Sequence, residues 1–151
     1  MTTPFTQAAE LALYLTSVLS TIRVANGYHT DIGQRVFRGK LSKVDDDVPC
    51  SVIVEGNDTP GASVSRDAVK ITQSYVFGGY MPCDPDNPND AAHLVLKDIK
   101  KAMFKDGPSM GGRVQKIEYQ GRDIGPRPDG TAIVFAVVHV DISFAETLMD
   151  A

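Results

Sequence analysis

The sequence has no apolar run of the roughly 18 to 20 residues that a membrane-spanning helix needs. Its first residues, Met1-Thr2-Thr3-Pro4, lack the basic stretch followed by an apolar block that marks a secretion signal. Cysteine is scarce, since Cys50 and Cys83 are far apart, one in a strand-like run and one in a Pro/Asp loop. We therefore expect the chain to stay in the cytoplasm where it is made, with two free thiols.

Motifs that bind phosphate or calcium are also missing. Neither Gly78-Gly79 nor Gly111-Gly112 opens a helix with Lys-Ser/Thr, so these pairs predict bulges or hinges and no nucleotide site. Segment 84–90 alternates carboxylates as a calcium loop does, but Asn89 stands where glycine is required and Val95 where glutamate is required. This segment is typical of a loop that enters a helix.

Zinc spacing and a nucleophile motif are absent as well. No pair among Cys50, Cys83 and His93 has the two-to-four-residue spacing that zinc sites favour. No Ser or Cys stands in a recognisable nucleophile motif, and His139 is expected to face solvent or to bind a neighbouring side chain. The sequence therefore predicts no catalytic residue, no metal ion and no cofactor. The enzymatic alternative is a site assembled from scattered residues: His29, Asp31 and His139.

The composition is that of one globular domain. The chain has 151 residues, of which 42% are hydrophobic and 23% charged, so it is long enough to bury a core of its own. No internal repeat or low-complexity tract divides it. We expect a single domain over residues 1–151.

The net charge of −4 is unevenly distributed along the chain. Residues 41–90 include three basic and nine acidic residues, whereas residues 97–127 include eight basic and four acidic residues. If these segments lie on different surfaces, the polarity favours head-to-tail association in a ring. A basic patch that binds DNA would draw on residues 97–116. The negative net charge of the chain argues against general DNA affinity. The plain alternative is that both segments are solvated surface.

Apolar positions spaced by three and four residues predict two helices. The first begins at Thr3 and reaches about Ala25, where Asn26-Gly27 supplies the left-handed residue that ends helices. The second covers about 91–105, with acids before it, lysines in its last turn and Gly107-Pro108 behind it.

Period-two alternation and continuous apolar runs predict five strands. Their ranges are 31–41, 48–55, 69–80, 113–119 and 131–144. The last is almost unbroken in its apolar character, so we expect it to be central and covered on both faces. The segments 42–47, 56–67 and 121–130 are rich in Asp, Gly, Ser or Pro and are expected to be loops. The order α-β-β-β-α-β-β predicts an α+β fold, in which two main helices pack on a mostly antiparallel (mixed) sheet of about five strands.

The segment after the first helix carries a family resemblance. It reads Ile22-Arg23, then Gly27-Tyr28-His29-Thr30-Asp31-Ile32-Gly33, and leads into a Val/Phe strand. With the Asp/Pro loop before residues 91–100 and the closing apolar strand, this order resembles the tail terminator (minor tail, tail-completion) proteins of long-tailed bacteriophages. The resemblance implies an α+β subunit of a ring, commonly of six copies, that caps the tail tube and joins it to the head side. It marks five residues as family-motif or interface positions: Arg23, Gly27, Tyr28, Asp31 and Gly33.

The same resemblance implies the partners and the place of action. They are further copies of the chain, six in a ring by the resemblance, together with the tail tube protein and the neck or head-completion proteins, in the virion tail. It implies no catalytic residue and no cofactor. An acidic lumen would let DNA pass without specific binding, and we expect Asp45, Asp46 and Asp47 to face the channel or one face of the ring. The main alternative is a head-completion or neck protein of the same particle.

Overall fold

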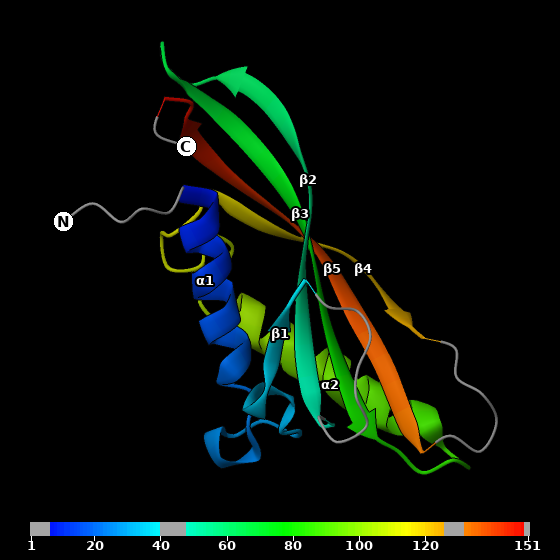
Figure 1. Ribbon diagram of the computed structural model, residues 1–151. Helices are drawn as coiled ribbons and strands as arrows, with labels where there is room; N and C mark the ends of the chain where they lie inside the picture. The colour runs from blue at the N-terminus through cyan, green and yellow to red at the C-terminus, as the bar shows by residue number, and fades with distance from the viewer. Residues whose placement is uncertain (1–6, 40–47, 126–131, 150–151) are drawn as a thin grey trace.

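The computed structural model describes residues 7–39, 48–125 and 132–149 (Figure 1). The elements are α1 (Gln7–Ser20), the 3-10 turns η1 (Val24–Asn26) and η2 (Ile32–Gln34), β1 (Val36–Arg38), β2 (Cys50–Ser63), β3 (Ala68–Pro82), α2 (Pro88–Phe104), β4 (Lys116–Ile124) and β5 (Ile133–Thr147). One mixed sheet has the strand order β1-β2-β3-β5-β4, with β1 parallel to β2 and the other neighbours antiparallel. This is an α+β fold, and the predicted order of helices and strands is confirmed.

The main core joins both helices to one face of the sheet. The predicted alternation of 69–80 is confirmed, because Ile71, Tyr75 and Phe77 of β3 are buried in this core. In β5 the even-numbered residues from 134 to 144 face it as well. Both helices contribute their apolar stripes, and the fully buried members include Leu15, Leu19, Val95 and Ile99. Among the residues the structure describes, no helix is long and apolar enough to cross a membrane.

A second, smaller core lies on the other face of the sheet and explains the unbroken apolar run of β5. It is built on Cys50, Val52 and Tyr80, and Ile133 and Phe135 pack against it. The rings of Tyr80 and Phe135 stack with their centroids 4.2 Å apart. The start of β5 is therefore covered on both faces, as expected, whereas its later odd-numbered residues turn polar. β5 lies inside the sheet between β3 and β4, although β3 is the middle strand.

The expected loop 56–67 is wrong over most of its length, because β2 continues to Ser63 and β3 begins at Ala68. Figure 1 shows the resulting arm, in which the distal parts of β2, β3 and β5 extend together. Register shifts lie between Glu55 and Asp58 and between Pro60 and Ser63, so the strand accommodates its turn-forming residues as bulges.

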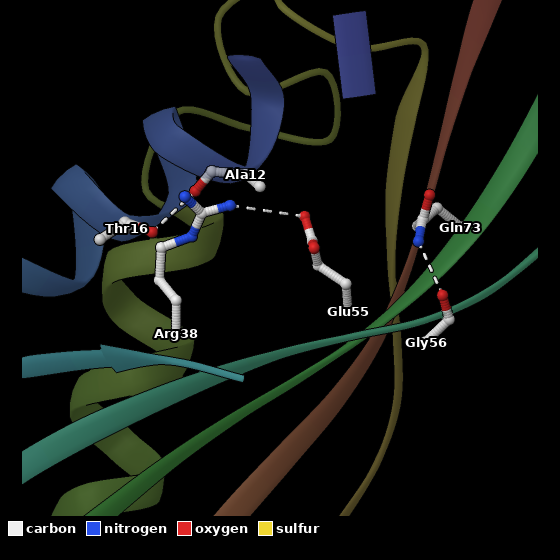
Figure 2. A network of polar contacts seen from close by, with 6 residues as sticks. All are labelled: Ala12, Thr16, Arg38, Glu55, Gly56 and Gln73. Carbon is white, nitrogen blue, oxygen red and sulfur yellow. Dashed lines mark hydrogen bonds and ion pairs between the residues drawn. The ribbon is translucent and has the colours of Figure 1, made fainter. Parts of the chain in front are cut away.

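Side chains of β3 hold the first of these bulges in place. The amide of Gln73 donates to the carbonyl of Gly56 at 2.8 Å (Figure 2). The hydroxyl of Ser74 donates to the carbonyl of Asn57 at 3.3 Å. These bonds replace backbone pairing that the extra residues interrupt, and they form only once the two strands are together. Local composition therefore favoured a loop where long-range bonding makes a strand.

Other predicted boundaries also move. The loop expected at 121–130 is wrong at its start, because β4 runs to Ile124 and passes Gly121 in a bulge with a φ of +123°. Of the strand expected over 31–41, the described part, residues 31–39, has only Val36–Arg38 in the sheet, and the turn η2 occupies its first part. The helix α1 ends at Ser20 rather than near 25. Its predicted N-cap, Thr3, lies outside the described residues.

Tyr75 carries the one buried side-chain polar atom without a hydrogen-bond partner among the described residues. Its side chain is 1% exposed and lies opposite Glu55 in the β2–β3 register. Burial, and secondly the Glu55 carboxylate, raises the pKa of the Tyr75 hydroxyl above its ordinary value of 10.0. An unmade hydrogen bond at such a site costs free energy, because the hydroxyl has lost its water without gaining a partner.

We expect Tyr75→Phe to raise the free energy of unfolding by about 1 kcal/mol at pH 7, because it removes the unsatisfied hydroxyl. Above pH 10 the unfolded wild type loses its tyrosine proton before the folded one does, so the wild type loses stability there and the variant loses less. Urea titrations at pH 7 and pH 10.5 measure both effects. Tyr119→Phe is the matched control, since its ring is exposed. A destabilised Tyr75→Phe would contradict the account.

Candidate functional site

The motif segment between α1 and β1 folds into a compact loop. Gly27 has a φ of +91°, in the left-handed region that favours glycine, and its N–H donates to the carbonyl of Val24 at 3.0 Å. The N–H of Tyr28 donates to the carbonyl of Arg23 at 3.3 Å. The left-handed residue predicted at this position is confirmed, but it ends the separate turn η1 rather than α1.

Asp31 and Gly33 close the loop against the end of α1. One carboxylate oxygen of Asp31 accepts from the backbone N–H of Val24 at 2.9 Å. The N–H of Gly33 donates to the carbonyl of Ile22 at 2.8 Å. A Cβ at position 33 would lie only 2.5 Å from the carbonyl oxygen of Leu19 and 2.7 Å from that of Ile22. Glycine is therefore required by close backbone approach.

The carboxylate of Asp98, on α2, binds the same loop from the other side. Asp98 is fully buried. It accepts hydrogen bonds from the N–H of His29 at 3.1 Å, from the N–H of Thr30 at 2.8 Å and from the Thr30 hydroxyl at 2.6 Å. Donors of this number and direction offset the cost of removing a carboxylate from water.

The sequence also indicates that Asp98 is buried, although this residue is not part of the family motif. Val95 precedes it by three residues and Ala102 follows it by four, so Asp98 is an acid on the apolar stripe of a helix. A charged residue at such a position predicts a buried partner, because charged side chains are almost never fully buried unless paired.

Tyr28 and Arg23 complete the motif. Tyr28 is 7% exposed, and the ammonium of Lys101 lies 4.8 Å from its ring centroid while donating to the carbonyl of Gly27 at 3.2 Å. The side chain of Arg23 is exposed and has no polar partner among the residues that the structure describes. Four of the five motif residues thus brace the loop, and Arg23 is the one that presents its side chain outward.

The scattered residues of the enzymatic alternative are not brought together. His29 lies on the helix-covered side, where its backbone binds Asp98. His139 lies on the opposite face of the sheet, where its ring nitrogen Nε2 is 2.9 Å from a carboxylate oxygen of Asp123. The expectation that His139 binds a neighbour is confirmed. Asp31 is engaged by the backbone of Val24, as described above.

The remaining candidates divide into placed and unplaced residues. Asp84 accepts from the N–H of Asp86 at 3.0 Å, so the predicted helix-entry loop before α2 is confirmed. Cys50 and Cys83 are not joined in a disulfide, as expected. Over residues 7–39, 48–125 and 132–149, no three His, Cys, Asp or Glu side chains gather in a way that could hold a metal ion. The predicted channel acids Asp45, Asp46 and Asp47 lie outside these residues.

A surface hollow of about 350 Å³ lies between α2 and β4. Its walls are Lys100, Lys101, Phe104 and Tyr119, and the ammonium of Lys100 sits 4.7 Å above the Tyr119 ring centroid. It combines apolar surface with two positive charges. Such a surface suits contact with an acidic protein segment.

Comparison with protein-family models and with curated proteins yields no match to this chain.

We expect Asp98→Asn to lower the free energy of unfolding by about 2–4 kcal/mol, because an amide NH₂ would face backbone donors that need an acceptor. Urea unfolding followed by circular dichroism measures the change. Asp90→Asn is the control on the same helix, since this acid is exposed in the first turn and is worth at most about 1 kcal/mol there. Equal stability of Asp98→Asn and wild type would show that the loop does not depend on this carboxylate.

Proposed function

We propose that this chain is a structural protein of a long-tailed bacteriophage, whose copies form the terminator ring that caps the tail tube, ends its growth and joins the tail to the head side. One observation carries the proposal. Two acids of β2, Glu55 and Asp58, lie toward one edge of the sheet, and basic residues of α2 and β4 lie toward the other, which suits head-to-tail association.

The two edges are unlike in charge. Near the first edge, β2 contains two acids, Glu55 and Asp58, and no lysine or arginine, although the guanidinium of Arg38 on the edge strand β1 lies 3.9 Å from the Glu55 carboxylate. At the other edge, Lys100 of α2 reaches over Tyr119 of β4, and Lys101 follows it on the same helix. On β4 itself, Lys116 and Arg122 are matched by Glu118 and Asp123. A copy that offers its acidic edge to the basic edge of the next would be attracted in one orientation and repelled in the reverse one.

The end of the arm offers a contact surface of another kind. Val64, Leu148 and Met149 are exposed by 57%, 64% and 82%. They gather at this end because the N–H of Leu148 donates to the carbonyl of Asp67 in the β2–β3 turn. Large apolar side chains grouped on a projecting element favour contact with another protein. In a terminator ring, the tail tube or a neck protein would cover this end.

The proposed assembly has no need for bond-making chemistry. The motif residues serve a rigid loop, which suits a subunit that acts through its shape. We propose a homo-oligomeric ring, a hexamer by resemblance, that contacts the tail tube protein and neck or head-completion proteins in the virion. DNA would pass through without specific binding, and the acids at 45–47 would line the channel or a ring face.

The test is to produce the full chain alone and together with the tail tube protein encoded nearest to it. We expect native mass spectrometry and negative-stain images to show a ring with one defined subunit number, in solution or on the tube end. Raising the salt concentration should weaken the ring, because exposed charges of opposite sign are screened.

Each outcome bears on the proposal. A strict monomer at high concentration, with and without the tube protein, would refute the ring. Binding to empty heads in place of tail tubes would favour a head-completion or neck protein. Turnover of a substrate that is lost on changing a single polar side chain would favour the enzymatic alternative.

A further inference from the structure

We propose that neighbouring copies of this chain join by backbone pairing, with β4 of one copy added to the exposed edge of β2 in the next. This inference rests on the proposed ring and names the surface that forms it. It follows from the hydrogen bonds at the two edges of the sheet, from the directions of the strands and from the charges beside them.

The first open edge belongs to β2, beyond the end of β1. β1 covers only Ser51–Ile53, where the N–H of Ser51 donates to Arg35 and the carbonyl of Ile53 accepts from Gly39 at 2.7 Å. Gly39 then turns the chain with a φ of +75°. Since the backbone groups of every second residue point to the same side, Glu55 is the next to point outward. From Glu55 to Ser63, no described residue pairs with this side of β2.

The second open edge belongs to β4. The N–H of Gly125 donates to the carbonyl of Phe135 at 2.7 Å, so the alternation directs the backbone groups of Arg122 and Ile124 away from β5. At the start of the strand, the N–H of Ile117 is already bound to the carbonyl of Pro108. The free edge of β4 therefore runs from Tyr119 to Ile124 within the described part of the chain.

The strand directions allow these edges to pair without inverting a subunit. β2 and β5 run one way, and β3 and β4 run the other way. When a second copy is placed beside the first in the same orientation, its β4 lies antiparallel to β2, which is the more stable pairing. The helix-covered faces also stay on one side. Repeating this step with one rotation produces either a closed ring or a spiral, and never a two-fold dimer.

Charge selects this pairing over the pairing of like edges. Two β2 edges in contact would bring Glu55 and Asp58 against their own copies, which is unfavourable. Against β4, the same acids would approach Lys100 and Arg122, since Lys116 is already paired with Glu118 at 3.5 Å. The heterologous contact is thus the one with opposite charges.

Pro60 limits the length of the pairing. It has no N–H to donate, and a register shift follows it, so the usable part of the β2 edge is Glu55–Thr59, which includes the bulge between Glu55 and Asp58. This short segment matches the length of the free edge of β4. Prolines, bulges and charges on edges are the features that prevent indiscriminate strand addition. The same features leave one segment open for the correct partner.

Two proline variants and their mixture test the inference. Glu55→Pro blocks the β2 edge and Arg122→Pro blocks the β4 edge, and both remove outward N–H groups that their own sheet does not use. We expect each variant alone to associate about tenfold or more weakly than wild type, because hydrogen bonds across the contact are lost. An equimolar mixture should form a heterodimer and nothing larger, since one unblocked edge of each kind remains. Native mass spectrometry measures both, and circular dichroism checks that the variants fold.

A cysteine pair provides a second measurement that does not depend on the proline variants. The double variant Asp58→Cys with Gln120→Cys should form disulfides between copies of the full-length chain and produce a ladder of covalent oligomers. Asp58→Cys with Leu94→Cys is the matched control, because Leu94 is exposed on α2 away from the β4 edge. We expect no ladder from the control. The native Cys50 is buried and is retained in both variants, whereas the half-buried Cys83 is changed to serine in both.

The outcomes separate this inference from the proposed function. If both proline variants form rings of wild-type size and the cysteine pair yields no ladder, the edges are not the interface although the ring stands. If either variant alone forms a two-fold dimer, the contact is between like edges and the inference is wrong. If wild type forms no oligomer even with the tube protein, the proposed function fails with it.

Discussion

The buried carboxylate of Asp98 is the interaction on which the organisation of this protein depends. It lies on α2 but binds the backbone of His29 and Thr30, in the loop that leads from α1 to the first strand. One side chain thereby positions the loop between α1 and β1 against the helix that packs on β3 and β5. A buried carboxylate without hydrogen-bond donors costs free energy in a dry interior. The loop and α2 must therefore form together.

The sheet distributes its two faces unequally. The helix-covered face has a continuous core, and the other face has a small apolar cluster at one end, beyond which polar residues follow. Gly78 shows how closely this cluster is packed, because a Cβ there would lie 2.7 Å from the Phe135 ring. A sheet with one face free of helices can present that face to a channel, while its edges remain available for neighbours. These are the geometric needs of the proposed ring subunit.

Much of the fold follows from local patterns, whereas the arm does not. The alternation in β3 and the apolar stripe of α2 predict these elements well, because burial on one face selects residues at fixed spacing. The distal part of β2 is held by Gln73 and Ser74, which approach from another strand, so its Gly, Asn, Asp and Pro residues indicate a loop when they are considered alone. The motif glycines were recognisable as special backbone positions. The partner of the loop, Asp98, is 68 residues from Thr30 and is recognisable only as an acid on an apolar stripe.

The exposed outer half of β2 affects how the subunit behaves before it meets a partner. Every residue from Gly56 to Ser63 is exposed, so this segment is stabilised by bonds to β3 with little burial of its own. Its amide protons should exchange with solvent through brief local opening, long before the region around α2 exchanges. A neighbour that adds a strand there would slow this exchange. In the proposed ring, the arm would thus reach its full protection only on assembly.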